Sequence, residues 1–422
     1  MSADIVITVN LVNNSAGPIT LPGVVVPNDG KPVRIGQVGA VGDNWTAAIA
    51  FQTVNAHTPD MRVFLGGTSG RLRDYGVELV GDTSARGTDT MVGTRISYDG
   101  GVVTATVDHV FAPWTHRLAD ALQLHQVTIP GTHDSGTFGM GAYNCCQDMT
   151  ILEQLYVGVR YFDIRVSTKS AALQVVHASY PTYYTLAEVA TTFRKFLDGT
   201  LNVNATEETI VVQIKVDDGP DDAQWAQAIL DCVEAAFDKA VNQPWLDPVE
   251  QYSPTFGSLH GRLVVLRRFE QPAAAPNGTP VKYFVSLDVF NQWWGKPQWA
   301  AEFDKNKFEW VDPGKGNVDY RTLQGVSFRL QDNYQTTREI KANIVRGVLD
   351  DAANGVMPDS WYLNFSSAAP AAHPRWVAAY VNPRVEGWLD EAAKNPKLAR
   401  YGTILMDFPS VAMCQKLIAK NF

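Results

Sequence analysis

Residues 129–137 read Ile-Pro-Gly-Thr-His-Asp-Ser-Gly-Thr, an apolar strand end that breaks into a tight polar turn carrying His133. A second histidine, His177, lies further along, and between the two stands Tyr-Phe-Asp-Ile-Arg, residues 161–165. One imidazole can take a proton, the other can give one, and the guanidinium of Arg165 can hold an anionic phosphate. These residues therefore predict a site for moving a phosphoryl group by acid–base chemistry without a metal ion.

From Pro113 onward, apolar runs alternate with longer amphipathic segments. This alternation is typical of strands and helices that build a parallel sheet or barrel. The eight candidate strands are Gln126–Ile129, Arg160–Val166, Gln174–His177, Thr209–Val216, Arg262–Arg267, Val326–Leu330, Trp361–Phe365 and Thr403–Met406. Helical periodicity marks Leu186–Leu197, Ala223–Ala240, Thr337–Ala353 and Val385–Lys394.

Eight such strands predict an α/β fold of the distorted (β/α)8 TIM-like barrel type. In these barrels the catalytic groups gather at the carboxyl ends of the strands. The candidate site residues follow that rule, since each of them ends or follows a candidate strand. These residues are His133, Asp163, Arg165, His177, Lys215, Arg267, Asp332, Tyr334 and Asp407. We therefore expect them to meet at one end of the barrel.

Residues 1–112 differ in texture, with short β-rich runs separated by Asn, Gly and Pro turns. The clearest pairing is Thr94–Tyr98 with Val102–Val107, because Asp-Gly-Gly stands between them as a hairpin reversal. The pattern predicts an N-terminal all-β, sandwich-like domain, followed by a catalytic barrel over residues 113–422. Nothing in residues 1–112 defines the role of the first domain.

Composition narrows the function classes. The 422 residues are 45% hydrophobic and 19% charged, as in a folded soluble protein, and the net charge of -9 argues against a nucleic-acid binder. Four cysteines are too few for a disulfide framework. The sequence shows neither a run of 18 apolar residues nor a basic N-terminal region followed by an apolar core, so we expect a soluble chain.

Taken together, the motifs resemble the bacterial phosphatidylinositol-specific phospholipase C family of the X-domain type. The resemblance covers roughly Trp114 to Phe422. It is carried by residues 129–137, Gly-Val-Arg-Tyr-Phe-Asp-Ile-Arg at 158–165, His177, Glu-Thr-Ile-Val-Val-Gln-Ile-Lys at 208–215, Gln-Asp-Asn-Tyr at 331–334, Leu-Asn-Phe-Ser-Ser at 363–367 and Leu-Met-Asp-Phe at 405–408.

This resemblance implies cleavage of phosphatidylinositol to diacylglycerol and inositol 1,2-cyclic phosphate. His133 would be the general base that takes the proton of the inositol 2-hydroxyl, and His177 the general acid that protonates the departing diacylglycerol oxygen. Calcium-dependent relatives place a carboxylate at the position of Arg165, so the arginine implies that no metal and no other cofactor is needed. Its planar donor fork suits the charged transition state.

The resemblance also implies supporting roles. Asp407 would orient His133, Asp134 would support the leaving-group side, and Asp163 would support Arg165. The inositol pocket would be lined by Lys215, Asp332, Tyr334 and one of the arginines at 267 and 268. We favour Arg267, because strand alternation from Val265 points it inward.

Two other functions remain open. One is a metal-dependent glycerophosphodiester or sphingolipid phosphodiesterase, and the other is a catalytically inactive lipid- or sugar-binding protein. Glycosylated inositol lipids are further expected substrates of the leading function. The expected partner is a phosphatidylinositol-containing membrane surface, bound peripherally and transiently. The oligomeric state is not predicted.

Two features leave their own alternatives. Three tryptophans within residues 290–299 either enter a lipid interface or pack over the barrel rim. The resemblance points to secretion, whereas the absent signal peptide and the few cysteines favour a cytoplasmic or unconventionally exported protein.

Overall fold

The computed structural model describes most of the chain from residue 113 onward and the strands before it. The described residues are 7–13, 19–21, 24–27, 29, 31–38, 47–55, 58–65, 77–82, 94–99, 102–107, 113–198, 205–237, 255–269, 285–286, 303–304, 309–310, 320–321, 327–334, 336–369, 373–393 and 400–422. Contacts divide the chain into two units, Met1–Ala112 with Leu152–Val157, and Pro113–Ile151 with Gly158–Phe422. The tryptophans of residues 290–299 lie outside the described residues, so their packing stays a prediction.

The first unit contains short strands in its described residues before position 113. They are β1 (Ile7–Asn13), β2 (Ile19–Leu21), β3 (Val24–Val26), β4 (Pro32–Val38), β5 (Ala47–Asn55), β6 (Thr58–Leu65), β7 (Val77–Asp82), β8 (Thr94–Asp99) and β9 (Val102–Val107). They form a four-stranded sheet of order β4-β1-β9-β8, a three-stranded sheet β5-β6-β7 and the pair β2-β3. β8 and β9 pair antiparallel, so the predicted hairpin is confirmed.

The second unit is built on a sheet of parallel strands. These are β10 (Ile129–Thr132), β11 (Tyr161–Ser167), β14 (Ile210–Asp218), β15 (Leu263–Arg268), β16 (Val285–Ser286), β20 (Ser327–Gln331), β21 (Ser360–Phe365) and β22 (Thr403–Met406). Their spatial order is β16-β15-β14-β11-β10-β22-β21-β20, and β19 (Tyr320–Arg321) adds to β20 antiparallel. A separate small pair joins β17 (Phe303–Asp304) to β18 (Glu309–Trp310). The predicted α/β barrel class is confirmed.

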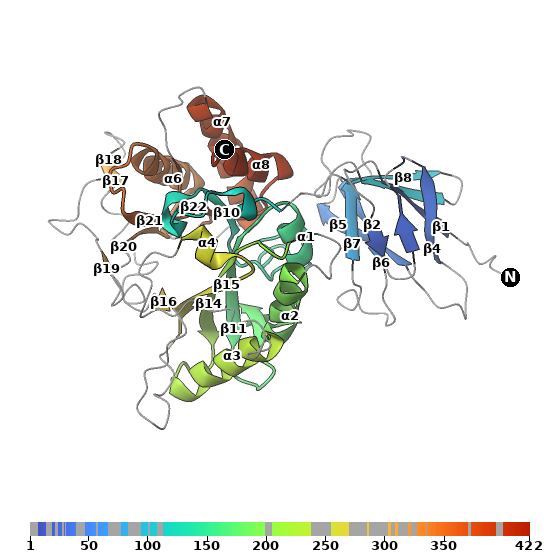
Figure 1. Ribbon diagram of the computed structural model, residues 1–422, viewed down its shortest axis with the longest axis horizontal. Coiled ribbons are helices and arrows are strands. Elements are labelled where there is room, and N and C mark those ends of the chain that lie inside the picture. The colour runs from blue at the N-terminus through green and yellow to red at the C-terminus, as the bar shows by residue number, and fades with distance from the viewer. Residues whose placement is uncertain are drawn as a thin grey trace. The chain divides into compact units, whose positions relative to one another are not determined.

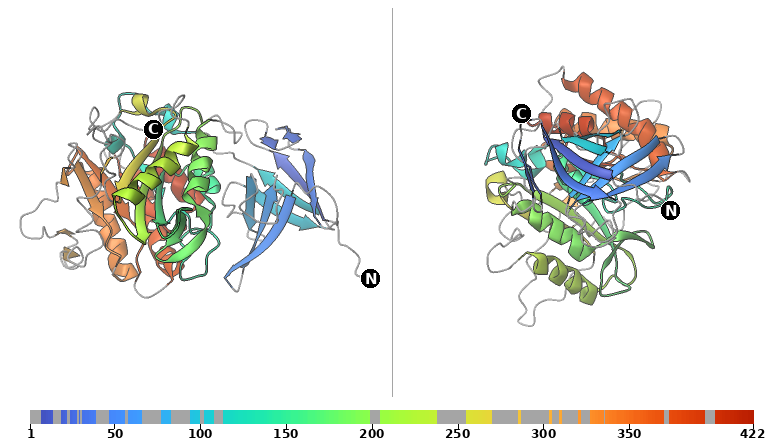
Figure 2. Two further views of the ribbon diagram at one scale, coloured as in Figure 1. Left: turned by 90° about the horizontal axis from the view of Figure 1, so that it is seen from below. Right: turned by 90° about the vertical axis from the view of Figure 1, so that its right-hand side faces the viewer.

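Helices surround the parallel strands (Figures 1 and 2). They are α2 (Leu186–Leu197), α3 (Ala223–Ala236), α4 (Phe256–Leu259), α6 (Arg338–Ala353), α7 (Pro374–Ala393) and α8 (Val411–Ala419), with short 3-10 turns at Thr115–Arg117 and Leu124–Gln126. A further helix, α1 (Ile151–Tyr156), is grouped with the first unit from Leu152 onward. Side-chain caps begin α2 and α6: the Thr185 hydroxyl accepts from Glu188 N–H and that of Thr337 accepts from Ile340 N–H. α2 has the predicted bounds, whereas α7 begins before the predicted Val385.

Two strand predictions need correction. The first barrel strand is Ile129–Thr132, because Leu124–Gln126 forms a 3-10 turn before it. Gln174–His177 is a strand, β12, but it lies off the barrel wall, in an antiparallel hairpin with β13 (Tyr180–Thr185). The parallel strand missing from the predicted set is β16.

Side-chain alternation along the strands separates the core from the polar end of the barrel. Tyr161, Val211 and Val264 are neighbours in register on β11, β14 and β15, and all three belong to the buried core cluster. Four residues further along the same strands, Arg165, Lys215 and Arg268 are neighbours in register. Residues four apart on a strand share a face, so these cations lie above the apolar core at the carboxyl ends.

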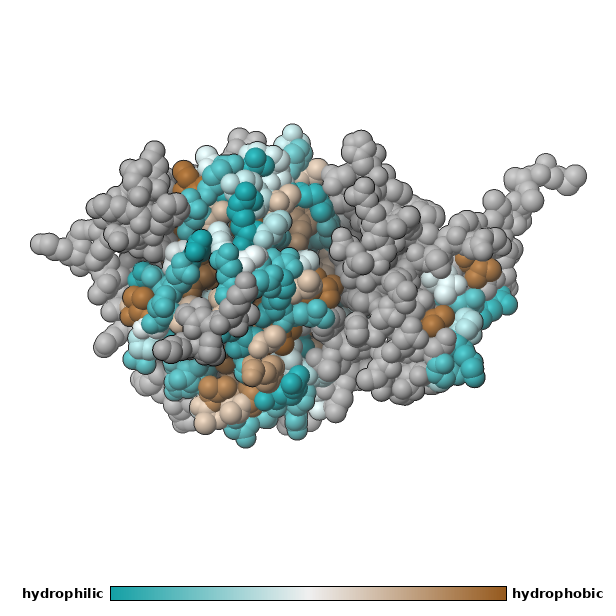
Figure 3. Space-filling view, turned by 90° about the horizontal axis from the view of Figure 1, so that it is seen from above, coloured by the Kyte–Doolittle hydropathy of each residue, from teal (hydrophilic) through white to brown (hydrophobic). Residues whose placement is uncertain are grey.

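The described residues on one face of the molecule are mostly polar. Figure 3 shows hydrophilic residues over most of the described part of one face, with hydrophobic residues in small separate groups. Among the described residues, no helix has the length and apolar character needed to cross a membrane.

Candidate active site

The turn after β10 positions the first predicted site residues. His133 N–H donates to the carbonyl of Met406 at 3.0 Å, which ties the turn to β22. Asp134 then adopts a left-handed backbone, with φ of 44°. This reversal lets the backbone N–H groups of Asp134 and Ser135 donate to the Asp163 carboxylate (3.2 Å) and carbonyl (2.9 Å). The polar turn is therefore held between two barrel strands.

His133 is held at both ring nitrogens. Its Nδ1 lies 2.8 Å from Asp407 Oδ1, and its Nε2 lies 3.3 Å from Asp134 Oδ2. Burial by itself would lower the pKa of His133, but the negative charges of Asp134 and Asp407 outweigh it and raise the pKa to about 9. The imidazole is therefore mostly protonated at neutral pH while no substrate occupies the site.

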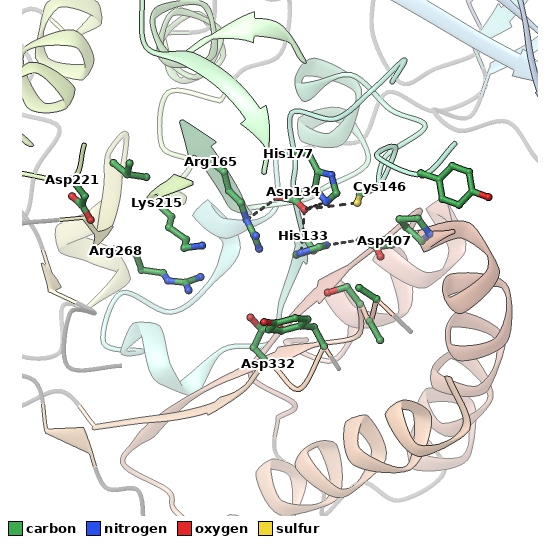
Figure 4. A pocket seen from close by; sticks show the side chains of 17 residues that line it. His133, Asp134, Cys146, Arg165, His177, Lys215, Asp221, Arg268, Asp332 and Asp407 are labelled. Carbon is green, nitrogen blue, oxygen red and sulfur yellow. Dashed lines mark hydrogen bonds and ion pairs between the residues drawn. The ribbon is translucent and has the colours of Figure 1, made fainter. Parts of the chain in front are cut away.

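Asp134 is the centre of the constellation. Its Oδ1 lies 2.7 Å from Arg165 Nε. Its Oδ2 faces both histidines, at 3.3 Å from His133 Nε2 and 3.2 Å from His177 Nε2. One buried carboxylate therefore links the predicted base, the predicted acid and the predicted phosphate-binding arginine (Figure 4).

Arg165 is surrounded by carboxylates. Besides Asp134, it pairs with Asp163 at 3.0 Å and with Asp217 at 3.3 Å. Burial works against the charged guanidinium, but these three carboxylates hold its pKa above its ordinary value. In turn, the Arg165 charge keeps the pKa of Asp163 below its usual range despite burial, helped by His133 and Arg268. The guanidinium is therefore a permanent positive charge in a fixed orientation.

His177 stands at the end of β12, outside the barrel wall. Its side chain is 24% exposed, and its Nδ1 lies 3.3 Å from the Asn144 amide oxygen. The hairpin that carries it touches β11 through the Val166–Val175 pair. The second imidazole is thus held by the Asp134 carboxylate at Nε2 and by a neutral amide oxygen at Nδ1.

These groups line a cavity of about 600 Å³ (Figure 4). Its lining includes the predicted site residues His133, Asp134, Arg165, His177, Lys215, Asp332, Tyr334 and Asp407. Asp163 is fully buried beneath the cavity, where it also accepts from Gln213 at 2.7 Å. Its carboxylate contacts the Arg165 guanidinium at 3.0 Å.

Arg267 is the prediction that needs correction, because Arg268 lines the cavity in its place. The inward positions on β15 are Val264, Leu266 and Arg268, and the Arg267 guanidinium turns away to contact the carbonyl of Phe269. Burial, together with the nearby charge of Arg165, lowers the pKa of Arg268 to about 10. Lys215, which contacts Asp217, also has a pKa lowered by burial.

The loop that carries Asp332 and Tyr334 rests on a buried polar network. Lys341 Nζ donates to Gln331 Oε1 (2.8 Å) and to the carbonyl of Asn333 (3.0 Å). Gln331 Nε2 donates in turn to Asn364 Oδ1 at 2.7 Å. Burial lowers the pKa of Lys341 to about 7. This network fixes the backbone on either side of Asp332.

The sequence reasoning missed several residues of the site. Asp217 comes two residues after Lys215, so on a strand the two side chains point to the same face, and the sequence alone could have predicted this. Cys146 and Asn144 also belong here, and Gln147 Nε2 donates to the carbonyls of His133 (2.7 Å) and Met406 (2.9 Å). The Cys145–Cys146 pair has no motif spacing, so only the fold brings Cys146 to the cavity.

The fold and the site together define an α/β barrel with a centre of two histidines and one arginine. Residues 123–269 match the family described as phosphatidylinositol-specific phospholipase C, X domain. The 1-phosphatidylinositol phosphodiesterase of Staphylococcus aureus strain Newman is 26% identical over 312 residues, covering 70% of this chain and 87% of that protein. The protein of the same name from Listeria monocytogenes is 22% identical over 317 residues, covering 73% and 84%.

Solved structures agree on the fold. The phosphatidylinositol-specific phospholipase C of Listeria monocytogenes superposes with a TM-score of 0.54 at 20% identity, over 74% of this chain and 98% of that one. A mutant of the Staphylococcus aureus enzyme gives a TM-score of 0.55 at 20% identity, over 74% and 96%. The predicted resemblance is confirmed: residues 123–269 match the X domain of the family, and over about 70% of its length this chain is similar to the bacterial 1-phosphatidylinositol phosphodiesterases.

Proposed function

We propose that this protein is a metal-independent phosphodiesterase that cleaves phosphatidylinositol to diacylglycerol and inositol 1,2-cyclic phosphate. The single observation that carries the proposal is the convergence of His133 Nε2 and His177 Nε2 on Asp134 Oδ2, at 3.3 and 3.2 Å, next to Arg165. A base, an acid and a fixed cation are the groups that an intramolecular phosphoryl transfer needs.

In the first step, neutral His133 takes the proton of the inositol 2-hydroxyl. The freed oxygen forms a bond to the adjacent phosphorus, while the bond from phosphorus to the glycerol oxygen breaks. Protonated His177 gives its proton to that glycerol oxygen, so diacylglycerol leaves as a neutral alcohol. Arg165 stabilises the extra negative charge on the phosphoryl oxygens during the transfer.

The polar rim of the cavity suits an inositol ring. Lys215, Arg268 and Asp332 offer charged partners for ring hydroxyls, and the exposed ring of Tyr334 offers a surface for stacking on the sugar. We further propose that the protein meets its substrate by transient, peripheral binding to a membrane surface. Glycosylated inositol lipids are proposed as additional substrates.

The test is phosphorus NMR of phosphatidylinositol in mixed micelles, incubated with the protein in excess EDTA. We expect a cyclic inositol phosphate signal that is lost in His133→Ala and in His177→Ala. Activity that appears only after calcium or magnesium is added would favour the metal-dependent phosphodiesterase. Vesicle binding without turnover under either condition, unchanged in His133→Ala, would favour the inactive binding protein.

A further inference from the structure

Cys146 is a cavity residue for which the proposed reaction has no use. Its side chain is buried, with a relative exposure of 1%. Its Sγ lies 3.9 Å from Asp134 Oδ2, the oxygen that both histidines approach. The thiol has no role in the proposed proton transfers. It does add a soft sulfur ligand to the imidazole nitrogens and the carboxylate oxygen that meet at this point.

The spacing of these atoms suits a tetrahedral metal ion. One ligand atom each from Asp134, Cys146 and His177 lie within 4.8 Å of one another. Asp134 Oδ2 is 3.2 Å from His177 Nε2 and 3.9 Å from Cys146 Sγ. Bonds of about 2.0–2.3 Å to zinc place tetrahedral ligand atoms about 3.3–3.7 Å apart. The two distances from Asp134 Oδ2 therefore lie within a few tenths of an ångström of the tetrahedral spacing.

The outer contacts of the ligands resemble those of protein zinc sites. A metal-binding histidine commonly bonds through one ring nitrogen while the other is held by an oxygen. His177 presents Nε2 to the cluster, and its Nδ1 contacts the Asn144 amide oxygen at 3.3 Å. His133 is arranged in the same way, with Nε2 toward Asp134 and Nδ1 on Asp407. It is the nearest candidate for a fourth ligand, and water is the alternative.

The charge around Asp134 is divided between its two oxygens. Arg165 contacts Oδ1, whereas the histidines and the thiol face Oδ2. A cation at Oδ2 therefore sits on the side of the carboxylate away from the guanidinium. Binding replaces the Cys146 thiol proton, which is released to solvent as the sulfur–metal bond forms. Thiolate and imidazole ligands select zinc over magnesium and calcium.

We propose that Asp134, Cys146 and His177 form a site for one zinc ion that inhibits the enzyme. A bound ion occupies the His177 nitrogen that would otherwise carry the proton for the leaving group, and it takes up Asp134 Oδ2. Zinc binding at this site does not depend on the proposed function. The inhibitory role of zinc does rest on the proposed function.

The first test measures binding with cobalt(II), a spectroscopic substitute for zinc. We expect the wild-type protein to bind one cobalt ion with a thiolate-to-cobalt charge-transfer band, and zinc to displace it. The band should vanish in Cys146→Ser and in Cys146→Ala, and it should persist in Cys145→Ser, which removes the adjacent buried thiol. Circular dichroism checks that each variant is folded.

The second test follows phosphatidylinositol cleavage as zinc is added, with each variant normalised to its own rate in EDTA. We expect zinc to inhibit the wild type and Cys145→Ser reversibly. Half-maximal inhibition of Cys146→Ser should require a zinc concentration at least about tenfold higher. Magnesium and calcium should have little effect on the rate of any of these proteins.

No band in the wild type, or a band that survives in both Cys146 variants, would overturn the site. A band without inhibition would overturn the inhibitory role. A band in a protein that never cleaves phosphatidylinositol would support the site while the proposed function fails.

Discussion

His133 and His177 reach the same carboxylate oxygen from two very different regions of the fold. His133 lies in the turn after β10, where its N–H bonds to Met406, its carbonyl to Gln147 and its Nδ1 to Asp407. His177 lies on the β12–β13 hairpin beside the wall, with a neutral partner at Nδ1 and two exposed tyrosines nearby, Tyr180 and Tyr183. The two imidazoles therefore lie at nearly equal distances from Asp134 Oδ2, although different parts of the fold hold them in place.

This difference indicates that the barrel itself orients His133 more directly than His177. Asp407, which pairs with His133, is braced by Asn382 Nδ2, which donates to the carbonyls of Asp407 (2.9 Å) and Phe408 (3.0 Å). Phe408 N–H donates in turn to the carbonyl of Cys146. The hairpin is braced mainly within itself, where Gln174 Nε2 donates to the carbonyls of Thr182 (2.9 Å) and Tyr184, and β12 meets β11 at the Val166–Val175 pair. We therefore expect changes near β10 to act on the base, and changes near the hairpin to act on the acid alone.

The largest effects should come from removing each imidazole and comparing two leaving groups. General acid or base catalysis is worth about 10²–10⁴ in rate, so His133→Ala and His177→Ala should each lose that much on phosphatidylinositol. With a nitrophenyl ester of inositol phosphate, the leaving nitrophenolate needs no proton. His177→Ala should then recover to within about tenfold of wild type, and His133→Ala should not.

Phosphorus NMR measures the lipid reaction, and the absorbance of nitrophenolate measures the ester reaction. Arg165→Lys serves as the matched control, because a weaker phosphate contact should slow both substrates alike. Equal recovery of the two histidine variants on the ester would contradict the division of roles.

Asp407→Asn tests the support of the base. We expect a loss of about 10–100-fold in kcat/KM at pH values above the pKa of His133, where the base is neutral in both proteins, because a hydrogen bond to a charged group contributes about 1.5–3 kcal/mol. Asp407 helps to raise the pKa of His133 to about 9, so the neutral amide lowers that pKa. The base must be neutral to act, and the rising limb of kcat/KM against pH reports its pKa in the free enzyme. On the nitrophenyl ester, which needs no general acid, the rising limb should therefore move from near pH 9 in the wild type to lower pH in the variant.

The control is Asp351→Asn, which removes a carboxylate paired with Arg329 and absent from the cavity lining. Its pH profile should match the wild type. A limb that stays in place in Asp407→Asn would mean that Asp407 does not set the protonation of His133.

Gly136→Ala tests the hairpin with a smaller change. A Cβ at position 136 would lie 2.7 Å from Cγ1 of Val175, on the strand that carries His177. The side chain must push β12 outward, and a small misplacement of the acid should cost about tenfold in kcat on phosphatidylinositol. The nitrophenyl ester should be cleaved at nearly the wild-type rate, because it does not need the acid.

The second substitution Val175→Ala makes room for the added methyl group, so the double variant should regain activity on phosphatidylinositol. Gly387→Ala is the control, since nothing lies within 4 Å of the Cβ it would add. A Gly136→Ala variant that loses both substrates equally would show that the turn after β10 had moved instead.

The sequence predicts the barrel and most of the site because both depend on local order along the chain. His133, Asp163, Arg165, Lys215 and Asp407 each end or follow a strand, so barrel topology alone brings them together. These residues could therefore be assigned to one site from the order of the strands, without any interatomic distance.

The failures share a physical reason. Val264, Val265 and Leu266 are all buried, because both faces of a parallel strand are covered, and their pattern cannot show which face contains the arginine. A short apolar strand such as β12 has the same sequence pattern in a hairpin as in a barrel wall. Cys146 and Asn144 reach the site through an irregular loop, which no periodicity describes. Lys341 stands on an amphipathic helix, where a lysine predicts an exposed position rather than a buried one.

Asn144→Ala should give the smallest effect and sharpens the comparison most directly. Asn144 occupies for His177 the place that Asp407 occupies for His133, but it offers a neutral oxygen at 3.3 Å to a partly exposed ring. A neutral hydrogen bond of this kind contributes about 0.5–1.5 kcal/mol, and exposure reduces it, so we expect a loss of about two- to threefold in kcat. The nitrophenyl ester should show no loss.

Asn144→Asp makes the two regions alike. A carboxylate beside Nδ1 favours the charged imidazole, and the acid must be charged to donate, so the falling limb of the pH profile should extend to higher pH. Steady-state kinetics across pH on phosphatidylinositol measures this extension. If the falling limb does not move, His177 is not the group whose protonation limits the reaction at high pH, and the equal distances to Asp134 would no longer imply paired roles.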